Sequence, residues 1–226
     1  MTLPKLTGPS FGPAAGGKPD ALVVMLHGLG ADGRDLIALA PMLARTLPRA
    51  LFVSPDAPFP CDMAPYGRQW FSLQDRAPAK LLEGMTLAQP IVDGFLDGTL
   101  GALGLDGSAV ALLGFSQGAM TSLYAGLRRT VAPAAILAFS GALVGEVPPR
   151  SQGTGSGYPP VLLVHGEEDP IVPFASFRHA QAALTAAGVP VEALARPGLG
   201  HGIDEAGLEA AQAMLARCLG AVAGPR

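Results

Sequence analysis

The sequence predicts an α/β fold: a single domain, residues 1–226, with a doubly wound, mostly parallel sheet and helices on both faces. Two observations support this. Short, continuous apolar runs alternate with longer segments of helical periodicity, which favours right-handed βαβ units. The chain has 226 residues, 49% hydrophobic and 15% charged, which suits one domain with a sizeable core. Continuous rather than alternating apolarity is typical of strands that are buried on both faces.

The expected elements follow in chain order. The apolar runs predict strands at 21–26, 50–53, 109–113, 134–139 and 161–164, with a weaker one at 189–195. Between them, apolar residues at helical spacing predict helices at about 32–46, 87–103, 117–130, 174–187 and 205–219. In the first of these helices, Leu36, Leu39, Ala40 and Leu43 fall on one face.

Three segments have no regular pattern. Residues 1–18 form an N-terminal extension, and residues 141–160, rich in Gly, Ser and Pro, are typical of a surface loop. The segment 54–84 contains several prolines and the only tryptophan, Trp70. Loops of this length within a compact domain are usually functional or disordered. We expect 54–84 to form a substrate wall, although its aromatic residues could equally anchor a long loop.

Composition excludes several classes of protein. A net charge of −3 gives no reason to expect a nucleic-acid partner. The apolar runs are far shorter than the roughly 20 residues of a membrane-spanning helix, and the N-terminus lacks the apolar stretch of a signal peptide. Cys61 and Cys218 are too few for a disulfide scaffold and have no metal-ligand spacing. We therefore expect a cytoplasmic protein without stable membrane insertion, as a monomer or a homodimer. We expect both thiols to be reduced, although a single disulfide between Cys61 and Cys218 is an open alternative.

The first of two glycine motifs matches a dinucleotide fingerprint. Residues 28–33, Gly-Leu-Gly-Ala-Asp-Gly, fit G-x-G-x-x-G between a strand and a helix, and Asp56 lies near the expected distance beyond. Taken alone, this pattern favours an NAD-dependent oxidoreductase. However, His27 and Asp32 place polar and acidic groups beside the supposed anion site.

The second motif predicts a nucleophile. Residues 114–118, Gly-Phe-Ser-Gln-Gly, fit G-x-S-x-G after an apolar run and before a helical pattern. Ser116 would then occupy a sharp strand-to-helix turn, exposed above the sheet at a helix N-terminus. Small residues are needed on either side of the serine because the turn brings the strand and the helix together.

Three histidines follow Ser116, and a base must come after the acid in this type of fold. His165 ends a predicted strand and is more typical of a buried, hydrogen-bonded histidine. His179 lies in a helical pattern and is expected to be solvated or at an interface. His201 lies in a glycine-rich loop between the last strand and the last helix, where a base could reach over the carboxyl edge of the sheet.

The candidate acid follows the strand at 161–164. Asp169 is the only aspartate between the serine and His201, and Pro170 stiffens the turn behind it. Glu167 and Glu168 share the same loop, so either could be the acid on loop geometry alone. A serine, an acid and a histidine in this order, each beyond a strand, favour a hydrolase over the dinucleotide alternative.

Taken together, these motifs resemble the phospholipase/carboxylesterase family of α/β-hydrolases, which includes acyl-protein thioesterases and small bacterial esterases. The matching stretches are residues 26–33, 114–118, 165–173 and 198–201, with 69–73 similar to the family's tryptophan segment near the acyl site. The resemblance covers almost the whole chain and implies the α/β-hydrolase fold. Residues 60–65 look more like the bacterial esterase branch than the eukaryotic thioesterases.

The resemblance also implies an oxyanion hole. The residues alone left Leu29 and Gly30 as alternative N–H donors in the glycine loop. The family implies Leu29, paired with the N–H of Gln117 after the nucleophile. By the same resemblance, Trp70, Phe71 and Leu73 are expected to line the substrate wall.

The expected activity is a serine carboxylesterase acting on small-molecule esters of short to medium acyl chain through an acyl-enzyme. Neither a metal nor a cofactor is required. The alternatives are an acyl-thioesterase or lysophospholipase on the same triad, a dienelactone-type hydrolase and, from another class, a non-catalytic binding module. The last alternative would usually have lost Ser116, Asp169 or His201, and all three are present.

Overall fold

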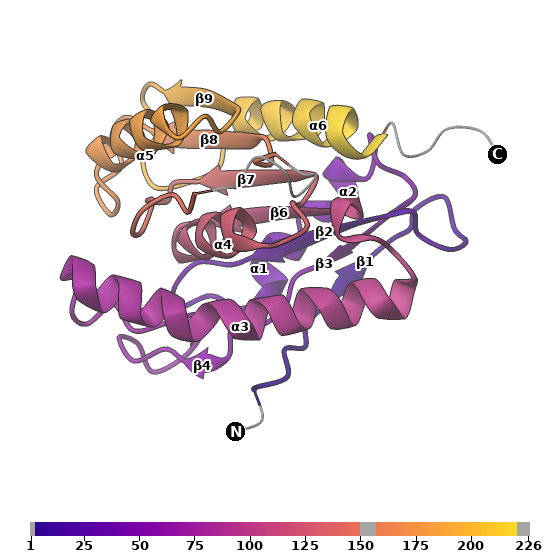
Figure 1. The fold of residues 1–226 in the computed structure, drawn as a ribbon, viewed down its shortest axis with the longest axis horizontal. Helices are drawn as coiled ribbons and strands as arrows, with labels where there is room; N and C mark the ends of the chain where they lie inside the picture. The colour runs from indigo at the N-terminus through magenta and orange to yellow at the C-terminus, as the bar shows by residue number, and fades with distance from the viewer. Residues whose placement is uncertain (1–2, 150–156, 221–226) are drawn as a thin grey trace.

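A computed structural model describes residues 3–149 and 157–220 of the chain. Its centre is a seven-stranded sheet in the order β1-β3-β2-β6-β7-β8-β9 (Figure 1). All neighbouring strands are parallel except β1, which pairs with β3 in the antiparallel sense. The strands are β1 (Ser10–Phe11), β2 (Ala21–Leu26), β3 (Ala50–Val53), β6 (Val110–Phe115), β7 (Ala135–Phe139), β8 (Val161–Gly166) and β9 (Val191–Arg196).

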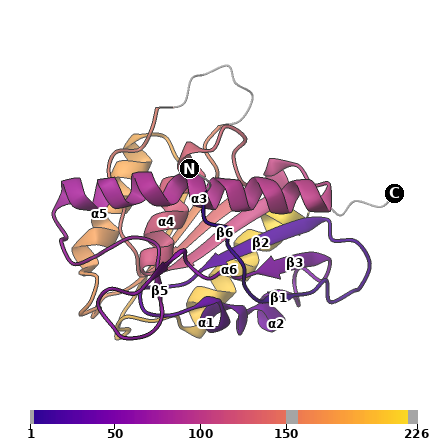
Figure 2. The same ribbon diagram turned by 90° about the horizontal axis from the view of Figure 1, so that it is seen from below.

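Helices cover both faces of this sheet (Figure 2). One face carries α1 (Gly33–Ile37), α2 (Ala40–Leu43) and α6 (Glu205–Leu219), and the other carries α3 (Pro78–Leu103), α4 (Gln117–Arg128) and α5 (Phe174–Ala186). A short 3-10 helix, Gly107–Ala109, precedes β6. None of the helices within the described ranges is long and apolar enough to cross a membrane.

The central strands are apolar throughout because both of their faces are packed. In β2, Leu22 and Val24 belong to the core cluster beneath α3, whereas Val23 and Met25 belong to the cluster beneath α1, α2 and α6. Side chains of successive strand residues point to opposite faces, so every position of the strand meets a helix layer. The predicted α/β class and parallel sheet are therefore confirmed, and the six predicted strands agree with the structure within two residues at each end.

Two helix predictions need correction. The segment 32–46 forms two short helices rather than one, because Pro41 has no N–H to donate to the carbonyl of Ile37. Helix α3 begins at Pro78, not at residue 87, with Pro78 at the first helical position, where its missing N–H costs nothing. The segment 54–84 is therefore helical at its end, and it also contains a small antiparallel pair, β4 (Phe59–Pro60) with β5 (Arg68–Gln69).

The two other irregular segments are also more ordered than predicted. Within 1–18, β1 extends the sheet at its edge beside β3. In the predicted loop 141–160, residues 150–156 lie outside the described part of the chain. Leu143 and Val144, which precede them, are buried in the core rather than exposed.

Candidate active site

Ser116 occupies a sharp turn between β6 and α4. Its backbone has φ 53° and ψ −117°, a left-handed conformation that is strained for a residue with a side chain. The turn is tight because a Cβ at Gly118 would lie 1.8 Å from the carbonyl oxygen of Leu26, and one at Gly114 would lie 2.3 Å from that of Gly118. The prediction that small residues must flank the serine is confirmed. The turn presents Ser116 above the carboxyl end of the sheet.

Asp169 and His201 meet at the same edge of the sheet, on the loops that follow β8 and β9. The Nδ1 atom of His201 lies 2.7 Å from Oδ2 of Asp169. The two loops are in close contact, since a Cβ at Gly166 would lie 2.2 Å from the carbonyl oxygen of Leu199. The backbone N–H of Glu168 also donates to that carbonyl, at 3.1 Å. The spacing between acid and base is thus fixed by backbone contacts.

The carboxylate of Asp169 is fully buried and fully hydrogen-bonded. Its Oδ1 accepts from the backbone N–H groups of Ile171 at 2.8 Å and Val172 at 2.9 Å, while Oδ2 faces His201. Burial raises the pKa of this carboxyl, but the hydrogen bonds from His201 and from the two N–H groups outweigh burial and hold the pKa below its ordinary value. Asp169 is therefore ionised at neutral pH.

The other candidates on this loop take different positions. Glu167 and Glu168 are exposed, and within the described ranges neither is hydrogen-bonded to His201. His165 is buried, and its Nε2 donates to the carbonyl of Val172 at 2.9 Å while lying 3.3 Å from Oδ2 of Asp169. His165 is thus the buried, hydrogen-bonded histidine that its position predicted.

The N–H groups of Leu29 and Gly30, in the glycine loop after β2, differ in their hydrogen bonding. The N–H of Gly30 donates to the carbonyl of Arg68 at 2.9 Å and is already satisfied. The N–H of Leu29 makes no such bond to any described residue, and Leu29 borders the same cavity as Ser116. The N–H of Gln117, at the first position of α4, likewise lacks a partner within its helix.

His27 holds this loop in place and was not singled out as a site residue from the sequence. It is fully buried: its Nδ1 donates to the carbonyl of Gly28 at 2.7 Å, and its Nε2 accepts from the N–H of Ala57 at 3.0 Å. Burial lowers the pKa of His27, so the imidazole is neutral. Its position directly before the first glycine of the motif was the available signal.

Trp70 and Phe71 do not form the substrate wall that the sequence predicted. Trp70 is fully buried, and its indole N–H donates to the carbonyl of His27 at 2.9 Å. The side chain of Gln117 bridges the two residues, accepting from the N–H of Trp70 at 2.9 Å and donating to the carbonyl of Phe71 at 2.7 Å. Both side chains pack in the core cluster beneath α3. Of the predicted wall, only Leu73 lines the cavity.

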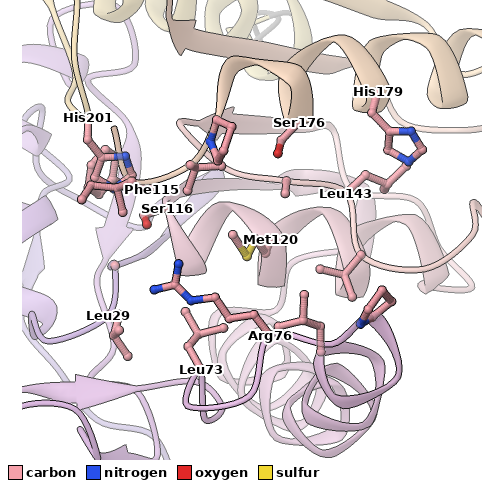
Figure 3. Close-up of a pocket in the computed structure, with 18 of the residues that line it drawn as sticks. Leu29, Leu73, Arg76, Phe115, Ser116, Met120, Leu143, Ser176, His179 and His201 are labelled. Carbon is pink, nitrogen blue, oxygen red and sulfur yellow. The ribbon is translucent and has the colours of Figure 1, made fainter. Parts of the chain in front are cut away.

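A cavity of about 790 Å³ opens beside Ser116 (Figure 3). Ser116, His201 and Leu29 lie at one end, and Met120 and Leu143 extend the wall away from them. Most of these wall residues were not expected at the site from the sequence. His179, expected to be solvated or at an interface, is exposed and lines the cavity. These additional wall residues are Arg76, Pro78, Leu81, Met120, Ala142, Leu143, Val144, Gly145, Ile171, Val172, Pro173, Ser176 and His179.

The dinucleotide alternative has no free anion site. Helix α1 has only five residues, and two carboxylates already cap its N-terminus. Asp32 accepts from the N–H of Arg34 at 2.8 Å, and Asp56, which the fingerprint would assign to a ribose, accepts from the N–H of Gly33 at 2.8 Å. A pyrophosphate at this position would be repelled by both carboxylates.

Comparisons with known proteins agree with this geometry. Residues 13–219 match the model of the phospholipase/carboxylesterase family. The chain is 30% identical over 188 residues to esterase YpfH of Escherichia coli, covering 83% of this chain and 78% of that protein. It is 28% identical to acyl-protein thioesterase 1 of Gibberella zeae, covering 88% and 91% of the two chains.

The solved structures give the same result. The crystal structure of esterase PE8 superposes with a TM-score of 0.85 at 40% identity, covering 95% of this chain and all of that one. That of SOBER1 from Arabidopsis thaliana gives 0.70 at 26% identity, covering 88% and 99%. The chain therefore belongs to the phospholipase/carboxylesterase family of α/β-hydrolases and is a serine hydrolase of the carboxylesterase type.

Proposed function

We propose that this carboxylesterase cleaves carboxylic esters through an acyl-enzyme formed on Ser116, with His201 as the base and Asp169 as its partner. One observation carries the proposal most strongly. Ser116 and His201 border the same cavity, and the buried Asp169 carboxylate accepts from Nδ1 of His201 behind them. That bond leaves Nε2 of the imidazole as the free nitrogen on the side of the serine.

In the first step, Ser116 Oγ attacks the acyl carbon while Nε2 of His201 takes its proton. Asp169 fixes the tautomer of the imidazole and stabilises the imidazolium that forms. Within the described residues, Ser116 Oγ and His201 share no hydrogen bond. Such bonds often tighten only when substrate is bound.

The developing oxyanion needs N–H donors that have no other partner. Among the described residues, the N–H groups of Leu29 and Gln117 meet this condition, and that of Gln117 lies at the positive end of α4. Gly30 is the weaker candidate because its N–H is bound to Arg68. His201 then protonates the leaving alkoxide, and a water molecule activated by the same imidazole releases the acid.

The cavity supports esters of short to medium acyl chain. Its wall is mostly apolar beyond the reacting groups, with Leu73, Met120 and Leu143 among its side chains. A methylene group in such a pocket changes discrimination by only about 1–3 kcal/mol, so a broad chain-length profile is expected. A thioesterase activity on the same groups is the second candidate, since relatives named acyl-protein thioesterase 1 align over most of the chain.

Location and assembly belong to the same proposal. We infer a cytoplasmic location from the cysteine count, since two cysteines are too few for the disulfide frameworks of small secreted domains. Whether the protein is a monomer or a homodimer stays a prediction, to be tested by light scattering of the purified chain.

The test is steady-state and rapid-mixing kinetics on 4-nitrophenyl esters of two to twelve carbon atoms, with the matching thioesters alongside. An acyl-enzyme predicts a burst of nitrophenol equal to the enzyme concentration wherever deacylation limits turnover. Ser116→Ala should lose turnover on every substrate while keeping the circular dichroism spectrum and melting temperature of the wild type. Retained turnover in this variant would remove the assignment of Ser116.

A further inference from the structure

One cavity residue has a charge that the proposed chemistry does not use. Arg76 precedes α3 and lines the cavity that holds Ser116. None of the residues lining this cavity is an aspartate or a glutamate, and only Arg76 among them is permanently cationic. The substrate cavity therefore has a fixed positive charge without a compensating carboxylate in its wall.

Arg76 also has no partner in the part of the chain that the structure describes. No ion pair or hydrogen bond joins its side chain to any residue in the described ranges 3–149 and 157–220. Its neighbour Asp75 instead accepts from the backbone N–H of Ala77 at 2.9 Å. By contrast, Arg68 on the same segment donates to the carbonyls of Ala57 and Pro58. Among the described residues, no such bond holds the side chain of Arg76 in place.

The direction of the side chain indicates what it could bind. Figure 3 shows Arg76 reaching from the α3 side into the cavity, with its guanidinium toward the end where Ser116 and Leu29 lie. Leu73 and Met120 provide apolar wall on either side of it. A substrate bound at Ser116 would therefore share the cavity with this guanidinium.

We propose that Arg76 binds an anionic oxygen group, a carboxylate or a phosphate, carried by the acyl chain of the ester substrate. This inference rests on the proposed ester hydrolysis and defines its substrate class. The planar guanidinium presents parallel N–H groups that match a carboxylate or phosphate in a bidentate manner. Because Arg76 is exposed, solvent and salt screen the attraction, so the selectivity it gives is moderate.

The experiment compares esters matched in length but not in charge. Hydrolysis of ethyl pentanoate, monoethyl glutarate and ethyl 4-(phosphonooxy)butanoate is followed by pH-stat for the wild type, Arg76→Gln, Arg76→Lys and Arg76→Glu. Arg45→Gln is the matched control, because Arg45 is also exposed but lies outside the cavity. It changes the net charge by the same amount as Arg76→Gln.

Arg76→Gln should lower kcat/KM for an anionic ester by about 5- to 20-fold and change the neutral ester by less than about twofold. Arg76→Glu should lower kcat/KM for the anionic ester further, and Arg76→Lys should retain part of the wild-type value. Arg45→Gln should leave the ratio of kcat/KM for anionic and neutral esters unchanged. The difference between wild type and Arg76→Gln on the anionic ester should narrow in 0.5 M NaCl. Whichever anionic ester depends on Arg76 identifies the group as a carboxylate or a phosphate.

Equal effects of Arg76→Gln on neutral and anionic esters, or none on either, would overturn the inference while leaving the esterase intact. A wild-type enzyme that hydrolyses none of these esters would instead overturn the proposed function, and this inference with it. The two failures are therefore distinguishable in one data set.

Discussion

The side-chain amide of Gln117 accepts a hydrogen bond from the backbone N–H of Trp70 at 2.9 Å, across 47 positions of the chain. The same amide donates to the carbonyl of Phe71, and the Trp70 indole donates to the carbonyl of His27. The residue after the nucleophile is thus connected through the tryptophan segment to the glycine loop. These contacts set the two N–H donors of the proposed oxyanion hole relative to each other.

Replacing Gln117 by Ala should therefore lower the stability of the protein. Two buried backbone groups would lose their partners, which costs about 1–3 kcal/mol each, so we expect the free energy of unfolding to fall by about 2–6 kcal/mol. Urea denaturation checks this value. The control is Gln212→Ala, whose half-buried side chain donates to the carbonyl of Met42 in a solvent-exposed hydrogen bond; its loss should cost below about 1 kcal/mol. Equal losses in both variants would contradict the bridging role.

Asp169→Asn should keep the fold but lose most activity. The amide can still occupy the buried pocket, but it no longer fixes the His201 tautomer or balances an imidazolium, and the equivalent change in other triads costs about 10⁴ in kcat. Steady-state kinetics on a 4-nitrophenyl ester measures the loss. A variant with more than about a tenth of the wild-type kcat would show that another group orients His201, and Glu167→Gln would be tested next.

The stability contribution of Asp169 should depend on pH in a defined direction. Its pKa is lowered in the folded protein, so the folded state favours the ionised carboxyl. That stabilisation is fully present above the unfolded-state pKa of about 3.9 and is lost as the pH falls through the lower folded-state value. Urea denaturation should show that the wild type and Asp169→Asn differ in free energy of unfolding by a constant amount from pH 7 to 5, and by less below about pH 4. A difference in free energy that widens in acid would contradict the lowered pKa of Asp169.

Two helical glycines offer a matched test of how tightly the turn at Ser116 is packed. A Cβ at Gly118 in α4 would meet the Leu26 carbonyl oxygen at 1.8 Å, whereas one at Gly94 in α3 would meet nothing within 4 Å. Gly118→Ala should therefore destabilise the protein by several kcal/mol, and Gly94→Ala should stabilise it by about 0.5–1 kcal/mol. Thermal unfolding of both variants tests the contrast. An unchanged melting temperature in Gly118→Ala would mean that the turn at Ser116 is less tightly packed than the structure shows.

Local sequence patterns were enough to predict the central elements. The strands β2 and β3 and helix α6 have the bounds that their apolar patterns predict, because both strands are continuous apolar runs and the helix keeps helical spacing over its whole length. The start of α3 was missed because Pro78 resembles a break in the chain, although a proline at the first helical position favours a helix. The pattern of nearby residues does not separate these two roles.

Contacts between distant residues decided the rest of the site. The choice between Leu29 and Gly30 depends on the carbonyl of Arg68, which belongs to another segment. The family resemblance predicts that Trp70 lines the cavity. In the structure its backbone N–H donates to the side chain of Gln117, and the indole is buried in the core. Burial of this kind depends on tertiary packing and leaves no local period in the sequence.

The central claim is that Ser116 is the nucleophile, and a serine-directed fluorophosphonate tests it most directly. Incubation of the intact protein should add one phosphonyl group, and peptide mass spectrometry should locate it on Ser116 with complete loss of esterase activity. Ser116→Ala should remain unlabelled under the same conditions. Modification of a different residue, or labelling of Ser116→Ala at the wild-type rate, would contradict the account.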